Sequence, residues 1–112
     1  MTPEQRAAIS CPVEATLQLI GGKYKSLILW HLMNETLRYS ELHRKMPWAT
    51  DKMLAQQLRE LEKDQLIIRT VYPVIPPKTE YALTEFGKSL SPILVAMKDW
   101  GDEYLTLSRE TE

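Results

Sequence analysis

The stretch that decides the fold is Thr50-Asp51-Lys52-Met53-Leu54-Ala55-Gln56-Gln57-Leu58-Arg59-Glu60-Leu61. An α-helix turns by about 100° per residue, so a helix here gathers Leu54, Leu58 and Leu61 on one face. The opposite face is cationic and bears amide groups, and it carries Lys52, Gln56, Arg59 and, one turn further on, Lys63. The pattern predicts an amphipathic helix whose leucines are buried and whose polar side chains point outward.

A β-hairpin is predicted directly after this helix. Residues 66–72 are rich in β-branched and aromatic side chains, which favour a strand, and residues 79–83 resume the pattern. The segment between them contains three prolines, which lack a backbone donor, so it should form a stiff, projecting loop that carries Lys78. A surface helix followed by such a hairpin is typical of a winged helix-turn-helix. An ordinary hairpin packed on a helix fits this fragment as well.

Three helices are predicted before this region. Pro12 suits the first position of a helix that ends at Gly21-Gly22. Residues 24–33 are apolar nearly all round, which predicts a central buried helix. Ser40 is a good N-cap for a short helix over residues 41–46. The order is then helix, turn, helix and hairpin.

The last helix predicts an assembly of two chains. Thr84 should cap it, and Ser91-Pro92 should kink it near its start. Its apolar positions continue for many turns, and one small domain cannot cover so long a stripe. Exposed stripes of this kind usually mark interfaces, and a two-fold dimer is the commonest solution. The apolar positions concerned are Val13, Leu17 and Ile20 in the first helix and Leu90, Ile93, Leu94, Met97, Trp100, Tyr104 and Leu107 in the last.

Bulk composition fits one globular domain. The chain has 112 residues, of which 44% are hydrophobic and 26% charged. No apolar run approaches the roughly 18 residues that span a bilayer, and the first residues do not resemble a signal peptide. A single cysteine cannot form an internal disulfide. We therefore expect a cytoplasmic protein that does not contact a membrane.

The net charge of -1 hides a gradient along the chain. Residues 23–78 hold ten basic and six acidic side chains, a balance of +4, whereas residues 79–112 hold three basic and seven acidic ones, a balance of -4. Binding to phosphates depends on where charge lies rather than on its total. The basic middle of the chain is therefore compatible with nucleic acid, with weak non-specific binding that depends strongly on salt.

Five blocks of sequence, taken together, carry a resemblance to a known family. They are Cys-Pro-Val-Glu at 11–14, Gly-Gly-Lys-Tyr-Lys at 21–25, Tyr-Ser-Glu-Leu at 39–42, Lys-Met-Leu-Ala-Gln-Gln-Leu-Arg-Glu-Leu-Glu at 52–62 and Tyr-Pro-Val-Ile-Pro-Pro-Lys-Thr-Glu-Tyr-Ala-Leu-Thr at 72–84. In this order they resemble the HxlR family of bacterial winged helix-turn-helix regulators. The resemblance implies a mainly α fold with a small β-wing, and a cytoplasmic homodimer that binds operator DNA and controls transcription.

We accordingly divide the single domain, residues 1–112, into three functional parts. Residues 11–22 and 84–107 are the expected dimerisation helices, residues 39–65 the helix-turn-helix, and residues 66–83 the wing. The chain departs from the family pattern at Gln65, where glycine is frequent, at Lys78, where arginine is common, and at Tyr24, where tryptophan is usual. A lysine on the wing is a single point charge rather than a bidentate fork, so minor-groove readout by this residue is in doubt.

The candidate DNA contacts follow from the helix-turn-helix context. Arg, Lys and Gln reach base edges and phosphates, so Lys52, Gln56 and Arg59 are expected in the major groove. Lys63 either contacts a phosphate or is merely solvated. Arg69 and Lys78 are expected on flanking backbone, and a double-stranded, pseudo-palindromic operator matches a two-fold dimer. The full set of candidates is Ser40, Thr50, Lys52, Gln56, Arg59, Lys63, Arg69 and Lys78.

Cys11 has two interpretations. A thiol at a helix N-terminus feels the positive end of the helix dipole, which favours the reactive thiolate. The resemblance adds that some relatives with cysteine here respond to oxidants or electrophiles, so an oxidant or small-molecule effector is one hypothesis. The other hypothesis is a small apolar side chain packed under the dimer interface.

Other kinds of site find little support in the sequence. Gly21-Gly22-Lys23 lacks the rest of a phosphate-binding loop, and His31, His43 and Cys11 lack the spacing of metal ligands. No nucleophile is paired with a base, so we expect neither an enzyme nor a metal or cofactor. A winged-helix module that docks another protein through the same outer face remains the strongest rival.

Overall fold

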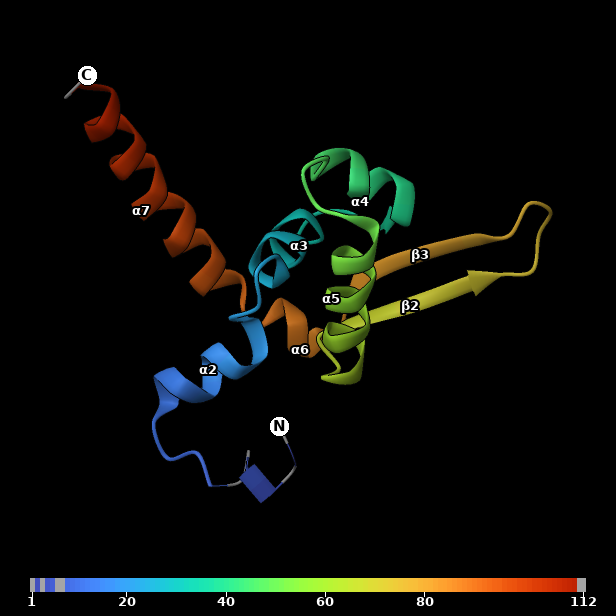
Figure 1. The fold of residues 1–112 in the computed structure, drawn as a ribbon, viewed down its shortest axis with the longest axis horizontal. Helices are drawn as coiled ribbons and strands as arrows, with labels where there is room; N and C mark the ends of the chain where they lie inside the picture. The colour runs from blue at the N-terminus through green and yellow to red at the C-terminus, as the bar shows by residue number, and fades with distance from the viewer. Residues whose placement is uncertain (1, 3, 6–7, 111–112) are drawn as a thin grey trace.

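The structure is a computed structural model that describes residues 2, 4–5 and 8–110. The helix α5 (Asp51–Lys63) stands across the middle of the molecule, the hairpin of β2 (Ile67–Tyr72) and β3 (Lys78–Leu83) projects on one side of it, and α7 (Ser91–Glu110) extends on the other (Figure 1). The elements follow in the order α2 (Pro12–Ile20), α3 (Lys25–His31), β1 (Leu37–Arg38), α4 (Tyr39–Lys45), α5 (Asp51–Lys63), β2 (Ile67–Tyr72), β3 (Lys78–Leu83), α6 (Glu85–Lys88) and α7 (Ser91–Glu110). This is the mainly α winged helix-turn-helix that the sequence predicts.

The core lies under α5. Leu54, Leu58 and Leu61 are buried there, as the helical spacing predicts, and they pack with buried residues of α3, α4 and the base of the hairpin. Burial of leucine side chains is the main favourable term in such a fold. The apolar face of α5 is therefore fully used inside one chain.

The sheet has three antiparallel strands in the order β1-β3-β2. Leu37 pairs with Tyr81 at one edge, and Ile67 pairs with Leu83 where the hairpin joins the core. The hairpin register runs out to Tyr72 opposite Lys78, and beyond that pair the proline-containing loop closes the hairpin. The two predicted strands and the intervening loop are confirmed.

The turn after α5 requires an unusual backbone. Gln65 has a φ of 62°, the left-handed conformation that glycine adopts most readily. Leu66 then donates its backbone N–H to the Leu61 carbonyl oxygen at 3.0 Å, which closes the helix end. The sequence departure at Gln65 thus falls at a left-handed position.

The last helical segment differs from its prediction. Thr84 caps the four-residue α6 by accepting the Gly87 N–H at 3.0 Å, and a separate helix, α7, begins at Ser91. Proline needs no donor in the first turn of a helix, so Ser91-Pro92 starts a helix here instead of kinking one. The predicted segment 84–107 is thus two helices, and α7 continues to Glu110.

Two further local predictions were wrong. Ser40 does not cap α4, because the helix begins at Tyr39 and the Arg38 backbone N–H donates to Glu41 Oε1 at 2.8 Å. Leu27 was expected inside a wholly buried helix, yet 39% of its surface is exposed. It lies away from Ile28 and Leu29, which face the core.

The described residues contain neither a membrane-spanning helix nor a metal-binding cluster. Within residues 2, 4–5 and 8–110, no helix combines the length and apolar character that a membrane crossing requires. Over the same residues, no cluster of three or more His, Cys, Asp or Glu side chains is arranged to hold a metal ion.

Candidate nucleic-acid interface

The outer face of α5 is the centre of the candidate interface. Thr50 caps the helix by accepting the Met53 N–H at 3.1 Å, so its hydroxyl is already engaged. None of the large exposed apolar side chains lies on α5, over the fully described range Asp51–Lys63. The predicted outward row is exposed throughout and consists of Lys52, Gln56, Arg59 and Lys63.

The turn that leads into α5 is fixed by side chains that the sequence analysis did not single out. The Tyr39 hydroxyl donates to Asp51 Oδ1 at 2.7 Å, and the two ring nitrogens of His43 lie 3.2 Å from Asp51 Oδ1 and 2.9 Å from the Ala49 carbonyl oxygen. Burial, together with the hydrogen bond to Asp51, raises the pKa of Tyr39 to about 12. The phenol therefore remains a donor at neutral pH and ties α4 to the start of α5.

The wing brings a second arginine to α5. Arg69 is exposed on β2, and it lines the same hollow of about 310 Å³ as Arg59. The hollow is completed by Ala55, Leu58, Glu62 and Tyr81. Arg59 of α5 and Arg69 of the wing thus line one depression between the helix and the hairpin, together with the acidic Glu62.

Lys78 does not project from the tip of the wing as predicted. It is the first residue of β3, its Nζ lies 2.7 Å from Glu80 Oε1, and it stands 5.1 Å from the centre of the Tyr72 ring. The hydrogen bond from Lys78 lowers the pKa of Glu80, so this ion pair persists at neutral pH. The tip itself carries Ile75, which is 100% exposed.

Ser40 is exposed at the second position of α4. The predicted candidates thus fall into two groups. Lys52, Gln56, Arg59 and Lys63 share one helix face, and Arg69 joins Arg59 at the junction with the wing. Ser40, Thr50 and Lys78 stand apart from this row, and the last two have their polar groups engaged.

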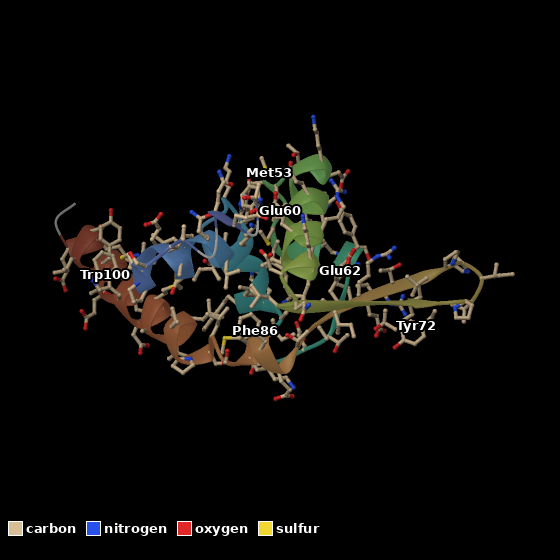
Figure 2. The ribbon with its side chains drawn as sticks, turned by 90° about the horizontal axis from the view of Figure 1, so that it is seen from below. Met53, Glu60, Glu62, Tyr72, Phe86 and Trp100 are labelled. Atoms are coloured by element: carbon tan, nitrogen blue, oxygen red, sulfur yellow. The ribbon has the colours of Figure 1, made fainter. Side chains whose placement is uncertain are left out.

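An ion pair between the buried Lys25 and the partly exposed Glu60 supports α5, and it was not anticipated. The side chain of Lys25 is only 9% exposed, and its Nζ lies 2.9 Å from Glu60 Oε2. Gln57, also buried, accepts the Tyr24 backbone N–H at 3.2 Å. Figure 2 shows Glu60 and Glu62 on opposite sides of α5. The sequence holds one signal for this pair, because a lysine in an otherwise apolar helix requires a partner.

The surface formed by α2 and α7 is apolar, unlike the polar outer face of α5. α2 and α7 expose large apolar side chains, and Trp100 stacks on Tyr104 with ring centres 5.7 Å apart (Figure 2). Two hollows of about 410 Å³ each lie between α7 and the α2–α3 region. Cys11 is exposed at the N-cap of α2, where its side chain makes no capping hydrogen bond.

Comparison with known proteins decides the class. The family model for the HxlR-like helix-turn-helix matches residues 19–109. The chain belongs to the HxlR family. A curated relative, the HTH-type transcriptional regulator YdeP of Bacillus subtilis (strain 168), is 52% identical over 94 residues, which are 84% of this chain and 73% of YdeP. HxlR proteins are transcriptional regulators that bind DNA and are not enzymes, and this chain is one of them.

Solved structures agree with the fold. The HTH-type transcriptional regulator YtcD of Bacillus subtilis superposes with a TM-score of 0.81 and 53% identity, over 86% of this chain and 98% of that one. The redox regulator HypR in its reduced form gives a TM-score of 0.83 with 45% identity, over 89% of this chain and 99% of that one. The oxidised form of HypR gives a TM-score of 0.80 with 49% identity, over 83% of this chain and 96% of that one. The HxlR-type winged helix is thus common to this chain and its relatives.

Proposed function

We propose that this HxlR-family regulator binds a pseudo-palindromic operator as a homodimer, with α5 in the major groove and the wing on flanking backbone. The observation that carries the proposal is the exposed row Lys52, Gln56, Arg59 and Lys63 over buried leucines. Arg, Lys and Gln make the commonest specific and phosphate contacts in that groove. Arg69, beside Arg59, then reaches the backbone next to the groove.

The dimer is proposed from the exposed apolar side chains of α2 and α7. Soluble monomers rarely expose so continuous an apolar surface, and a two-fold dimer buries it with like against like. The surface includes Val13, Leu17, Ile93, Met97, Trp100, Tyr104 and Leu107, whose exposed fractions range from 42% to 69%. Two recognition helices related by a two-fold axis predict half-sites about 34–36 Å apart, or a multiple of that spacing.

A direct test is footprinting on the DNA upstream of the chain's own gene and the neighbouring gene. The purified dimer should protect one palindrome, and raising salt should abolish the gel shift on unrelated DNA first. The rival function is a protein-docking module that uses the same face. A protein that shifts every DNA equally, or none, would favour this rival and contradict the proposal. Because an operator is part of the cell's own DNA, we propose that the protein acts in the cytoplasm.

A second proposal concerns Cys11. Its thiol is exposed at the start of α2, next to the apolar surface proposed for the dimer, and the similar protein HypR is a redox regulator. We propose that oxidants or electrophiles modify this thiol and thereby alter operator affinity. Operator binding should change after diamide treatment of the wild-type chain and should not change in Cys11→Ser. Equal affinities before and after treatment would leave Cys11 as a packing residue.

A further inference from the structure

The ion pair behind α5 lies at an unusual place for a cation. Lys25 is the first residue of α3, where the positive end of the helix dipole disfavours a positive charge, and burial disfavours it further. Glu60 compensates for both effects. The hydrogen bond from Lys25 lowers the pKa of Glu60, so the carboxylate is ionised at neutral pH. The ion pair with Lys25 therefore holds the Glu60 carboxylate in one place beside α3.

The second oxygen of Glu60 faces the DNA-reading row. Glu60 Oε2 lies 2.9 Å from Lys25 Nζ, while Glu60 Oε1 lies 3.5 Å from Nε2 of Gln56, one helical turn earlier. Gln56 is exposed on the outer face of α5. The carboxylate that Lys25 anchors therefore accepts a hydrogen bond from the amide proposed to read a base.

This contact selects one orientation of the Gln56 amide. With the NH₂ group toward Glu60, one N–H donates to the carboxylate, and the second N–H and the carbonyl oxygen remain available outward. The reversed amide would place its carbonyl oxygen against an ionised carboxylate oxygen. The reversed orientation is therefore disfavoured as long as Glu60 is ionised and held in place.

An amide fixed in this way presents one donor and one acceptor to the groove. Adenine offers the matching pair, an N7 acceptor and an N6 donor, whereas guanine offers two acceptors, N7 and O6. At guanine, the O6 acceptor would face the amide carbonyl oxygen, and two acceptors cannot form a hydrogen bond. Cytosine offers only its N4 donor and thymine only its O4 acceptor, so each can form one hydrogen bond with the amide instead of two. The fixed amide thus favours adenine over the other bases.

We propose that the Lys25–Glu60 pair sets a base preference of α5, by holding the Gln56 amide in the orientation that reads adenine. Glu60 and Lys25 are positioning residues, because they act through Gln56 and do not touch the base. The inference rests on the proposed function, since it requires that α5 lies in the major groove. It adds which base is read and which ion pair behind the outer row determines the reading.

The experiment is selection of bound sequences from a pool of random double-stranded DNA by the purified full-length chain. The wild-type protein should enrich adenine at one position in each half-site, by about tenfold over guanine. Gln56→Ala should remove the preference at that position alone. Glu60→Gln should reduce it to a few-fold, because the new amide both donates and accepts and so tolerates either orientation of Gln56.

Two further variants separate positioning from folding. Lys25→Met with Glu60→Gln removes both charges, so no unpaired lysine remains buried, and it should relax the same position. Glu85→Gln is the matched control: it also removes a negative charge, but Glu85 is an exposed residue of α6, away from the outer row of α5. It should keep the adenine preference. Thermal unfolding followed by circular dichroism verifies that each variant is folded.

The outcomes distinguish the inference from the proposed function. If the wild-type chain enriches no sequence, the operator-binding proposal fails and the inference fails with it. If the wild-type chain selects a palindrome but Glu60→Gln and the double variant retain its adenine preference, the inference alone is overturned. A uniform loss of affinity with the preference unchanged also overturns it, because the pair would then serve stability only.

Discussion

The two long helices of this molecule, α5 and α7, differ in how much of their apolar surface one chain can bury. Along α5, Leu54, Leu58 and Leu61 are all buried, and the opposite side is polar. Within Ser91–Glu110, all of which the structure describes, only Leu94 is buried, whereas Trp100 and Leu107 are 69% and 61% exposed. An α-helix whose apolar residues lie on several sides is normally enclosed by other chains or elements.

The two helices therefore differ in what covers their apolar side chains. α5 is held by its own domain, so its outer side chains are free to meet an external ligand. α7 has contacts with α3 but leaves most of its apolar side chains uncovered, which the proposed dimer explains. Substitutions on α7 should therefore change assembly, and substitutions on the outer face of α5 should change recognition.

The largest expected effect tests α7. Trp100→Ala should weaken the dimer by about 2–4 kcal/mol, because buried tryptophans are frequent hot spots and the change occurs twice in a symmetric interface. Sedimentation equilibrium measures the dissociation constant. Trp48→Ala is the matched control, since Trp48 is 60% exposed but lies in the turn before α5. Equal dissociation constants for both variants would refute the proposed interface.

The next effect tests α5. Arg59→Ala should weaken operator binding by about 1–3 kcal/mol without altering the dimer, because it removes a cation from the row that we propose to face the groove. Fluorescence anisotropy with the footprinted operator measures the affinity. Lys88→Ala on α6 removes an exposed cation away from that row and should leave affinity unchanged. A similar loss in both variants would mean that only overall charge matters.

A smaller effect concerns the end of α5. Gln65→Gly should stabilise the fold by about 0.5–1 kcal/mol, because glycine relieves the cost of a left-handed residue, partly offset by the greater freedom of glycine in the unfolded chain. Urea denaturation measures the free energy of unfolding. Gln18→Gly, inside α2, should instead destabilise by up to about 1 kcal/mol. A destabilised Gln65→Gly variant would contradict the account of this turn.

The smallest expected effect is a pH dependence of the folding stability that comes from the Lys25–Glu60 ion pair. The pKa of Glu60 in the folded chain lies below its ordinary value of 4.5, so the stability gained from the pair is present above that value. It is lost as the pH falls through the folded pKa. The side chain of Glu60 is 42% exposed, which limits the loss to about a few tenths of a kcal/mol. Urea unfolding at pH 7 and at a series of pH values below 4.5 should show it.

The comparison for this pH dependence is the variant Lys25→Met with Glu60→Gln. The variant lacks both titrating partners, so its stability should fall less steeply with acid than that of the wild-type chain. Parallel acid dependences of the two proteins would show that other carboxyl groups account for the whole effect.

The parts of the fold that the sequence predicts are those with a strong local signal. The leucine spacing of α5 and the β-branched run of β2 each depend on residues close together in the chain. The split between α6 and α7 was missed because Thr84 and Ser91-Pro92 are both helix-start signals, and the second was interpreted as a kink.

The supports of the candidate interface depend on distant residues and were not predictable in the same way. Tyr24 and Gln57 are 33 residues apart, and no local pattern announces that they meet. Lys78 was expected at the free tip because its partner across the loop, Tyr72, is found only when the strand register is known. The outward row of α5 was predictable, whereas the groups that orient it were not.

The uncovered side of α7 has a consequence for how a cell would use this regulator. Under the proposed dimer, two chains must meet before a palindrome is filled, so at low abundance occupancy rises with the square of the copy number. A twofold change in synthesis would then change promoter saturation by as much as fourfold. In the proposed dimer, the exposed apolar side of α7 thus makes the transcriptional response steeper than the change in gene dosage.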